Sequence, residues 1–264
     1  MAHPEDGRRA ALVYGNQLHL LATYRSLYQF AWAAMETRLA LRDLLSTDLS
    51  GIALDYGEVH ALRTAWRFLP AFDHPRSPGC CLVSRSGESG WEYRGSGESL
   101  TAHGEALPVL DHAAVRAPEL ASVYVIGGDG IARRVGLASG IGDAGIGSAR
   151  FSALGPELVL EPDLARLNGS ARLMRAGCEA WSGTAQWDGM AGALEAVEGE
   201  HFRRAGHRTP GDAHVHFFGA KLGGRCASVE NGDEIAVQWE ALGSQLRVVI
   251  QKERTSPEPI VLTL

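Results

Sequence analysis

The sequence lacks three features that would mark particular classes of protein. It has no lysine or arginine run that could follow a nucleic-acid backbone, and its formal net charge of -6 at pH 7 provides no basic field for phosphates. No segment approaches the ~18 continuous apolar residues of a membrane span. The first residues also lack the apolar stretch of a secretory signal. We therefore expect a cytoplasmic protein with neither a nucleic-acid nor a membrane partner.

Cysteine is scarce, and the four cysteines do not form the C-x-x-C spacing of a zinc or redox site. They are Cys80, Cys81, Cys178 and Cys226. This pattern favours reduced, mostly buried thiols without a redox function. His74 precedes Cys80 and Cys81 closely enough in the sequence to suggest a thiol and base pair, although the spacing gives no geometry for nucleophilic catalysis.

Apolar residues make up 45% of the 264 residues, enough for a sizeable core. Short runs at AALVYG and QLHLLA predict strands, and the apolar spacing within residues 23–49 predicts one or two helices. The stretch FLPAFDHPRSPGCCL then breaks regular structure with three prolines. We therefore predict a small N-terminal α/β domain over residues 1–72 and a larger domain over residues 73–264.

Short β-type runs separated by glycines dominate the larger domain. The run ASVYVIGGDGIARRVGLAS predicts a hairpin that turns at Gly127–Gly130, and DEIAVQWEALGSQLRVVIQ predicts a second one that turns near residues 241–244. Between them, WDGMAGALEAVEGEHFRR has helical spacing and ends in basic residues that suit a helix C-terminus. The predicted fold class is therefore α+β.

Several stretches occur in the order typical of one known family. PGDAHVHFFGA resembles a P-G-D-V-H-V-H-F-F-G-T motif, and ENGDEIAVQWEALGSQLR resembles a closing G-D…G-x-L hairpin. FDHP, WEYRG, APELASVYVIG and ALGPELVL add matches in the same order, and together they span residues 71–247. By these motifs the chain resembles the fumarylacetoacetate hydrolase superfamily, in its sugar-acid dehydratase-like branch. The resemblance implies a mixed β-roll beside a small N-terminal α/β domain, and a homodimer.

The resemblance also implies a metal centre whose ligands this sequence does not keep. Family members bind Mg²⁺ or Mn²⁺ through a Glu-x-Glu pair and an aspartate, and polarise a carbonyl substrate. The resemblance places Ala117, Glu119 and Gly142 at these three positions. Asp143 is one residue away, where an extended strand would point it to the opposite face unless the backbone is rearranged. We therefore expect no metal cofactor, or Mg²⁺ or Mn²⁺ if Asp143 rebuilds the site.

Two further departures concern loops near the expected pocket. The threonine that ends the H-V-H-F-F-G-T motif is Ala220 here. The lid segment expected after CCLVSRSG is absent, because WEYRG follows almost directly.

The candidate catalytic residues are Glu119, Asp143, His214 and His216. The two histidines lie two residues apart and share one face of a strand, from which they can bind a metal or relay protons. The family motif favours the alternative that they are hydrogen-bonded structural residues. Glu119 equally fits a solvated carboxylate at the start of a strand, and Asp143 fits a turn residue that accepts backbone hydrogen bonds.

Tyr93, Arg94 and Lys221 are the candidate substrate-binding residues. Tyr93 and Arg94 occupy the positions of a Y-K pair near the substrate in the resembling family. Lys221 follows a glycine turn, from which it can hold a carboxylate or a developing oxyanion. The alternatives are a tyrosine packed in a core and a lysine exposed on a loop.

These features predict a divergent, metal-independent enzyme that acts on a carbonyl-containing small molecule as a cyclase, isomerase or lyase of specialised metabolism. A shortened lid opens the site to a larger molecule. Two alternatives stay open: a non-catalytic protein that binds a ligand or partner, and a metal-dependent 2-oxo acid hydrolase or dehydratase. We expect Tyr93, Glu119, His214 and His216 to approach one common cavity from different strands. The substrate is not fixed by the sequence, because specificity in this fold lies in loops and pocket shape.

Overall fold

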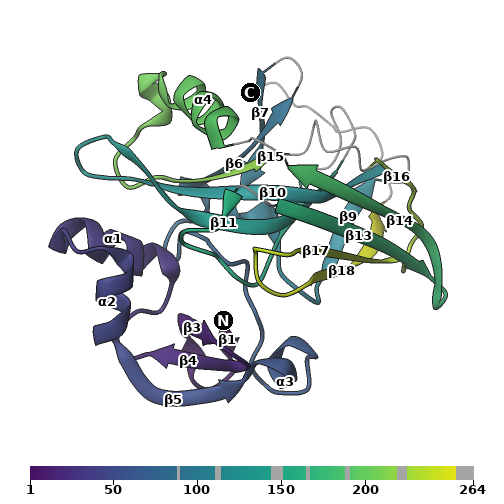
Figure 1. Cartoon of the computed structure of the whole chain (residues 1–264), viewed down its shortest axis with the longest axis horizontal. Helices are drawn as coiled ribbons and strands as arrows, with labels where there is room; N and C mark the ends of the chain where they lie inside the picture. Colours follow the sequence, from purple (N-terminus) through teal and green to yellow (C-terminus); the bar gives the residue numbers. More distant parts are fainter. Residues whose placement is uncertain are drawn as a thin grey trace, which may run out of the picture.

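The structure is a computed structural model that describes residues 1–87, 90–110, 114–143, 151–164, 167–187, 191–218 and 225–253. Helices and strands are mixed along the chain, and most of the described elements are strands (Figure 1). This confirms the predicted α+β class. Among the described residues, no helix has both the length and the apolar character needed to cross a membrane.

The N-terminal part is a three-stranded antiparallel sheet with short helices. The sheet contains β3 (Ala11–Tyr14), β4 (Gln17–Leu21) and β5 (Leu49–Asp55), which confirms both predicted strands. The helices predicted within residues 23–49 are α1 (Leu27–Thr37) and α2 (Leu41–Thr47). The remaining elements of this part are β1 (Ala2–His3), β2 (Gly7–Arg8) and α3 (Tyr56–His60).

The largest sheet has eight strands in the order β7-β6-β15-β10-β11-β12-β8, and β16 also pairs with β10. Its strands are β6 (Cys81–Gly87), β7 (Gly90–Ser96), β8 (Leu100–Thr101), β10 (Ala114–Ile126), β11 (Ala132–Asp143), β12 (Ser152–Leu154), β15 (Ala213–Phe218) and β16 (Arg225–Ser228). β15 is parallel to β6 and antiparallel to β10, so the sheet is mixed.

A five-stranded sheet packs against the first, in the order β14-β13-β17-β18-β9. Its strands are β9 (Ala106–Leu110), β13 (Leu167–Arg175), β14 (Cys178–Trp187), β17 (Glu234–Trp239) and β18 (Leu246–Glu253). The helix α4 (Ala191–Phe202) precedes β15, as the helical spacing predicted, and Figure 1 shows it beside the large sheet. Short 3-10 turns cover Pro78–Cys80, Gly97–Ser99 and Ala205–His207.

Both predicted hairpins are confirmed. β10 and β11 pair antiparallel, and Gly127 both donates its N–H to the Ile131 carbonyl and accepts from the Gly130 N–H. The second hairpin joins β17 to β18, where the Leu242 N–H donates to the Trp239 carbonyl. Glycines and polar residues therefore end the strands where the sequence indicated.

Each face of the large sheet packs into its own apolar core. Leu120, Ile141 and Phe218 pack with residues of the second sheet, including Trp239. On the opposite face, alternate residues of β15 and β10 such as Val215 pack with the helix α1 and with Phe72. Because both faces of β15 are covered, all six of its residues are buried.

Some expectations are tested only in part. Cys80, Cys81 and Cys178 are free thiols, but Cys178 is exposed, so the expectation of mostly buried cysteines is wrong there. The side chain of Cys226 lies outside the described part of the chain. The domain boundary after residue 72 and the homodimer stay predictions, and the apolar segment at residues 258–264 lies outside the described residues.

Candidate functional site

The register of β10 and β15 separates the predicted catalytic residues between two faces of the large sheet. His216 pairs with Ser122, and Phe217 pairs with Ala121. Glu119 shares the face of Ala121, because side chains alternate along a strand and the two residues are two positions apart. Glu119 therefore lies on the face opposite His216. The expectation of one cavity shared by Tyr93, Glu119, His214 and His216 is wrong for this reason.

Glu119 forms a buried ion pair with Arg85 of β6. An Arg85 guanidinium nitrogen donates to Glu119 Oε1 across the intervening strand β15. Glu119 is 1% exposed and Arg85 is 5% exposed, so the alternative of a solvated carboxylate is wrong. Glu119 Oε2 is also buried, and it has no hydrogen-bond partner in the described part of the chain. The carboxylate is thus neutralised on one oxygen and unpartnered on the other.

The two other positions that the resemblance assigns to metal ligands carry no carboxylate. Ala117 is fully buried and apolar. Gly142 abuts Glu119 so closely that a side chain built on it would collide with Oε2. Mg²⁺ requires several oxygen ligands in near-octahedral geometry. Glu119, Ala117 and Gly142, with a guanidinium already on one carboxylate oxygen, do not fit that ion.

The backbone of β11 shows whether Asp143 takes the position of Gly142. Gly142 pairs with Arg116 and Asp143 with Val115, so the strand continues in register through its last residue. The irregularities in this ladder fall on β10, between Arg116 and Glu119 and between Val123 and Tyr124. The backbone rearrangement that would bring Asp143 to the position of Gly142 is therefore not seen, and Asp143 ends a strand rather than occupying a turn. Its side chain lies outside the described part of the chain.

The opposite face holds a cluster of three histidines. His214 and His216 of β15 meet His201 from α4, with ring centroids of His201 and His216 4.2 Å apart. The corresponding distance is 5.4 Å for His201 and His214, and 5.6 Å for His214 and His216. All three side chains are buried. We call these three residues the histidine cluster.

Burial keeps the histidine cluster neutral. It lowers the pKa of His201 to about 3 and that of His214 to about 4. The pKa of His216 lies well below its ordinary value for the same reason, and the neighbouring histidines add to each shift. The backbone of His207 offsets the pKa shift of His214 in part, but neither nitrogen of His214 has a partner within hydrogen-bond geometry among the described residues. Each ring can therefore act as an acceptor or ligand at neutral pH.

A pocket of about 280 Å³ opens onto the histidine cluster. Its lining residues come from β6, β7, α4, the following turn and β15, and they are Leu82, Ser84, Gly90, Trp91, Tyr93, Glu200, His201, Arg204, His207 and His214. The predicted substrate-binding residue Tyr93 is among them and is 57% exposed. We call this cavity the histidine pocket. Arg94 is not among its described lining residues, and Lys221 lies outside the described residues.

Polar contacts hold α4 over the histidine cluster. The Tyr124 hydroxyl donates to Glu198 Oε1, which also accepts from Arg134 at 2.8 Å. Trp91 Nε1 donates to the Val197 carbonyl at 3.2 Å. These bonds connect the helix to β10, β11 and β7. They therefore hold His201, which lies on the same helix, over the large sheet.

His201 is the residue that sequence reasoning missed. It stands thirteen positions before His214 within a helix, a spacing that matches no short metal-binding motif. The helical spacing around His201 predicts a helix but not the strand on which the helix packs. The sequence therefore contains no signal for the contact of His201 with His214 and His216, which depends on the docking of α4.

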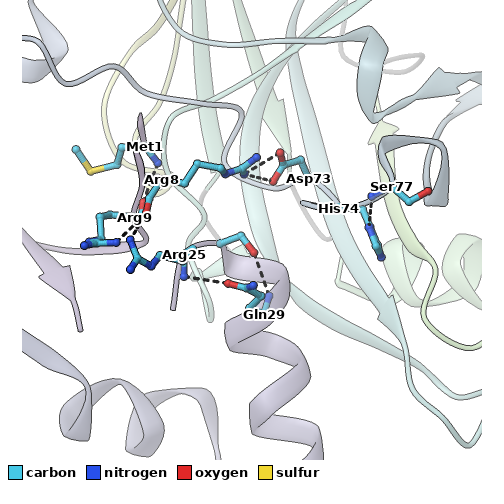
Figure 2. A network of polar contacts seen from close by, with 9 residues as sticks. Met1, Arg8, Arg9, Arg25, Gln29, Asp73, His74 and Ser77 are labelled. Carbon is cyan, nitrogen blue, oxygen red and sulfur yellow. Dashed lines mark hydrogen bonds and ion pairs between the residues drawn. The ribbon is translucent and has the colours of Figure 1, made fainter. Parts of the chain in front are cut away.

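The residues of the suggested thiol and base pair make other contacts. His74 Nδ1 accepts from the Ser77 backbone N–H at 3.0 Å, as Figure 2 shows. Cys80 Sγ contacts the Ser77 hydroxyl at 3.3 Å. Burial raises the pKa of Cys81 to about 12, so this thiol stays protonated. Asp73 accepts two hydrogen bonds from Arg8, at 2.6 and 2.8 Å. These residues therefore stabilise the linker.

Comparison with known proteins bears on the fold. No protein-family model matches the sequence, and a search of curated proteins finds no match. The structure is similar to 2-keto-3-deoxy-D-arabinonate dehydratase complexed with magnesium and 2,5-dioxopentanoate, with a TM-score of 0.67 and 15% identity over 93% of this chain and 95% of that one.

Two further similar structures have other activities. A maleylpyruvate hydrolase from Sphingobium sp. SYK-6, in complex with manganese(II) and pyruvate, gives a TM-score of 0.61 and 13% identity over 95% of this chain and 98% of that one. A 2-hydroxyhepta-2,4-diene-1,7-dioate isomerase from Mycobacterium marinum gives 0.59 and 15%, with 97% of each chain covered. The chain thus has the fold of the fumarylacetoacetate hydrolase superfamily, as its motifs predicted.

Proposed function

We propose that this chain is an enzyme of the fumarylacetoacetate hydrolase fold that acts on a carbonyl-containing small molecule without a carboxylate-bound Mg²⁺ or Mn²⁺ ion. The observation that carries this proposal is the buried Arg85–Glu119 pair at the position the resemblance assigns to the metal. A guanidinium is permanently charged, so it supplies positive charge where the metal-dependent enzymes use a divalent ion.

The free oxygen of Glu119 suggests the chemistry. Glu119 Oε2 is a buried acceptor without a partner among the described residues, so it can accept a proton from a substrate carbon that comes within its reach. Removal of that proton begins an isomerisation, an elimination or a cyclisation, the lyase, isomerase and cyclase reactions expected from the sequence. The carbonyl compounds bound by two similar structures, 2,5-dioxopentanoate and pyruvate, support a substrate of this class.

One observation favours a second candidate. Arg85 and Glu119 are almost wholly buried, and a buried ion pair can serve structure alone. The second candidate is therefore a non-catalytic protein that keeps the fold and binds a ligand or partner. The metal-dependent hydrolase or dehydratase has less support, because Gly142 remains in register beside Glu119.

Proton exchange next to a carbonyl separates these candidates. We expect the chelator-treated protein in D₂O to exchange the C3 protons of 2-oxo acids such as pyruvate and 2-oxobutanoate, followed by NMR. Glu119→Gln should slow this exchange by a factor of about 10²–10⁴, the usual contribution of a general base. Glu105→Gln, a control variant in a loop before β9, should exchange at the wild-type rate.

The opposite results would change the assignment. Exchange that appears only after Mg²⁺ is added would support the metal-dependent hydrolase or dehydratase. No exchange with any member of a panel of 2-oxo acids and 1,3-dicarbonyl compounds would support the non-catalytic protein.

A further inference from the structure

We propose that the histidine cluster binds a divalent transition-metal ion of the zinc type, on the face of the sheet opposite Glu119. This site goes beyond the proposed function, which places proton transfer at Glu119. His201, His214 and His216 each offer one nitrogen, and these ligand atoms all lie within 4.8 Å of one another. Zn²⁺ holds imidazole nitrogens at about 2.0–2.1 Å, so small rotations of the rings bring all three onto one ion.

The strongest support is that the ring nitrogens have no other partners. All six nitrogens of the three rings are buried, and none has a hydrogen-bond partner in the described part of the chain. An unsatisfied buried polar group costs about 1–3 kcal/mol, so such groups are rare in folded proteins. By contrast, the buried His103 has both nitrogens engaged, one with the His60 carbonyl and one with the Arg247 N–H. Among the described residues, the cluster therefore offers a ligand unpartnered nitrogens that His103 does not.

Aromatic neighbours restrict the rings to small rotations before any ion binds. The Phe202 ring stacks on His216 at 5.2 Å between centroids, and the Trp91 ring lies 4.3 Å from His216. The Trp91 ring is also 4.9 Å from His201. Rings held by packing lose little freedom on ligation, which favours binding.

The donor set selects the kind of metal. The cluster consists of neutral imidazoles, which suit Zn²⁺, Cu²⁺, Ni²⁺ or Fe²⁺, whereas Mg²⁺ prefers oxygen ligands. Three protein ligands also leave a tetrahedral ion one open position. His201 and His214 line the histidine pocket, so this position would face a cavity that also holds Ser84, Tyr93 and Arg204. Water or a small anionic ligand fits there.

Titration of the full chain with Zn²⁺ tests the proposal. The chelator-treated wild type should bind one ion per chain with micromolar or tighter affinity by calorimetry, and Co²⁺ should give the visible absorption of a tetrahedral site. His201→Gln and His214→Gln should each weaken Zn²⁺ binding by at least about tenfold. His19→Gln, in β4 and outside the cluster, should bind as the wild type, which controls for adventitious binding by the ten histidines.

Circular dichroism establishes that each variant is folded, and His201→Gln is the main test because its side chain comes from a helix rather than from the central strand. If the wild type bound Zn²⁺ no more tightly than His201→Gln or His214→Gln, the proposed metal site would be wrong and the cluster would be a structural one. A loss in only one of the two variants would also contradict a three-histidine site. The readout is metal binding, and proton exchange is measured with chelator present, so either proposal can fail alone.

Discussion

Arg85→Met should lower the free energy of unfolding by about 3–5 kcal/mol, because it leaves the Glu119 carboxylate buried without its charge partner. Leaving a buried charge unpaired costs much more free energy than breaking an ion pair on the surface. The measurement is urea unfolding at neutral pH, followed by circular dichroism.

Two further variants separate the ion pair from general effects of substitution. Arg85→Met combined with Glu119→Leu should recover most of the loss, since an apolar replacement of a buried pair is often neutral or stabilising. Arg42→Met removes an ion pair with Glu161 in which both side chains are more than three quarters exposed, and should cost less than about 1 kcal/mol. If Arg85→Met cost no more than Arg42→Met, the buried pair would not have the energetic role described.

Acid should destabilise the chelator-treated protein strongly between pH 6.5 and about 4. Burial lowers the pKa of His103 to about 4, as it does that of His214, and lowers the pKa of His201 to about 3. The unfolded chain takes up protons near pH 6.5, while the folded chain resists them down to the lower values. The unfolded state therefore binds more protons in this range, and the free energy of unfolding falls as pH falls.

The expected loss is on the order of 1–2 kcal/mol per buried histidine between pH 7 and 5. Urea unfolding at several pH values measures how steeply the free energy of unfolding changes with pH. His201→Gln should reduce this slope by the equivalent of about one bound proton. His19→Gln should leave the slope close to that of the wild type. A free energy of unfolding that is the same at pH 7 and pH 5 would show that these histidines are not held neutral in the fold.

The sequence predicted the fold well because its signals are local and ordered. The glycine turn at Gly127–Gly130, the helix before His214 and the two β-type hairpins each follow from residues close together in the chain. The ordered motifs of one family then predicted that these local elements form a β-roll. Such patterns are retained between two chains with about 15% sequence identity, because strand alternation and turns tolerate many different side chains.

The candidate site depends on contacts that no local pattern contains. Arg85 lies 34 positions from Glu119 and reaches it across β15, so only the strand order brings the two together. The strand period places His214 and His216 on one face, but the face of Glu119 depends on the register between β10 and β15. That register is set by packing across both cores, which is why the expected shared cavity was wrong.

Calorimetric titration of the chelator-treated protein with Mg²⁺ tests the central claim most directly, namely that the fold is kept while a guanidinium stands where the divalent ion is expected. The account predicts no binding at micromolar Mg²⁺, because Glu119 is engaged by Arg85 and the neighbouring positions are Ala117 and Gly142. Mg²⁺ also discriminates against the histidine cluster, since it prefers oxygen ligands. Micromolar Mg²⁺ affinity that disappears in Glu119→Ala would contradict the account and restore a metal-dependent hydrolase or dehydratase.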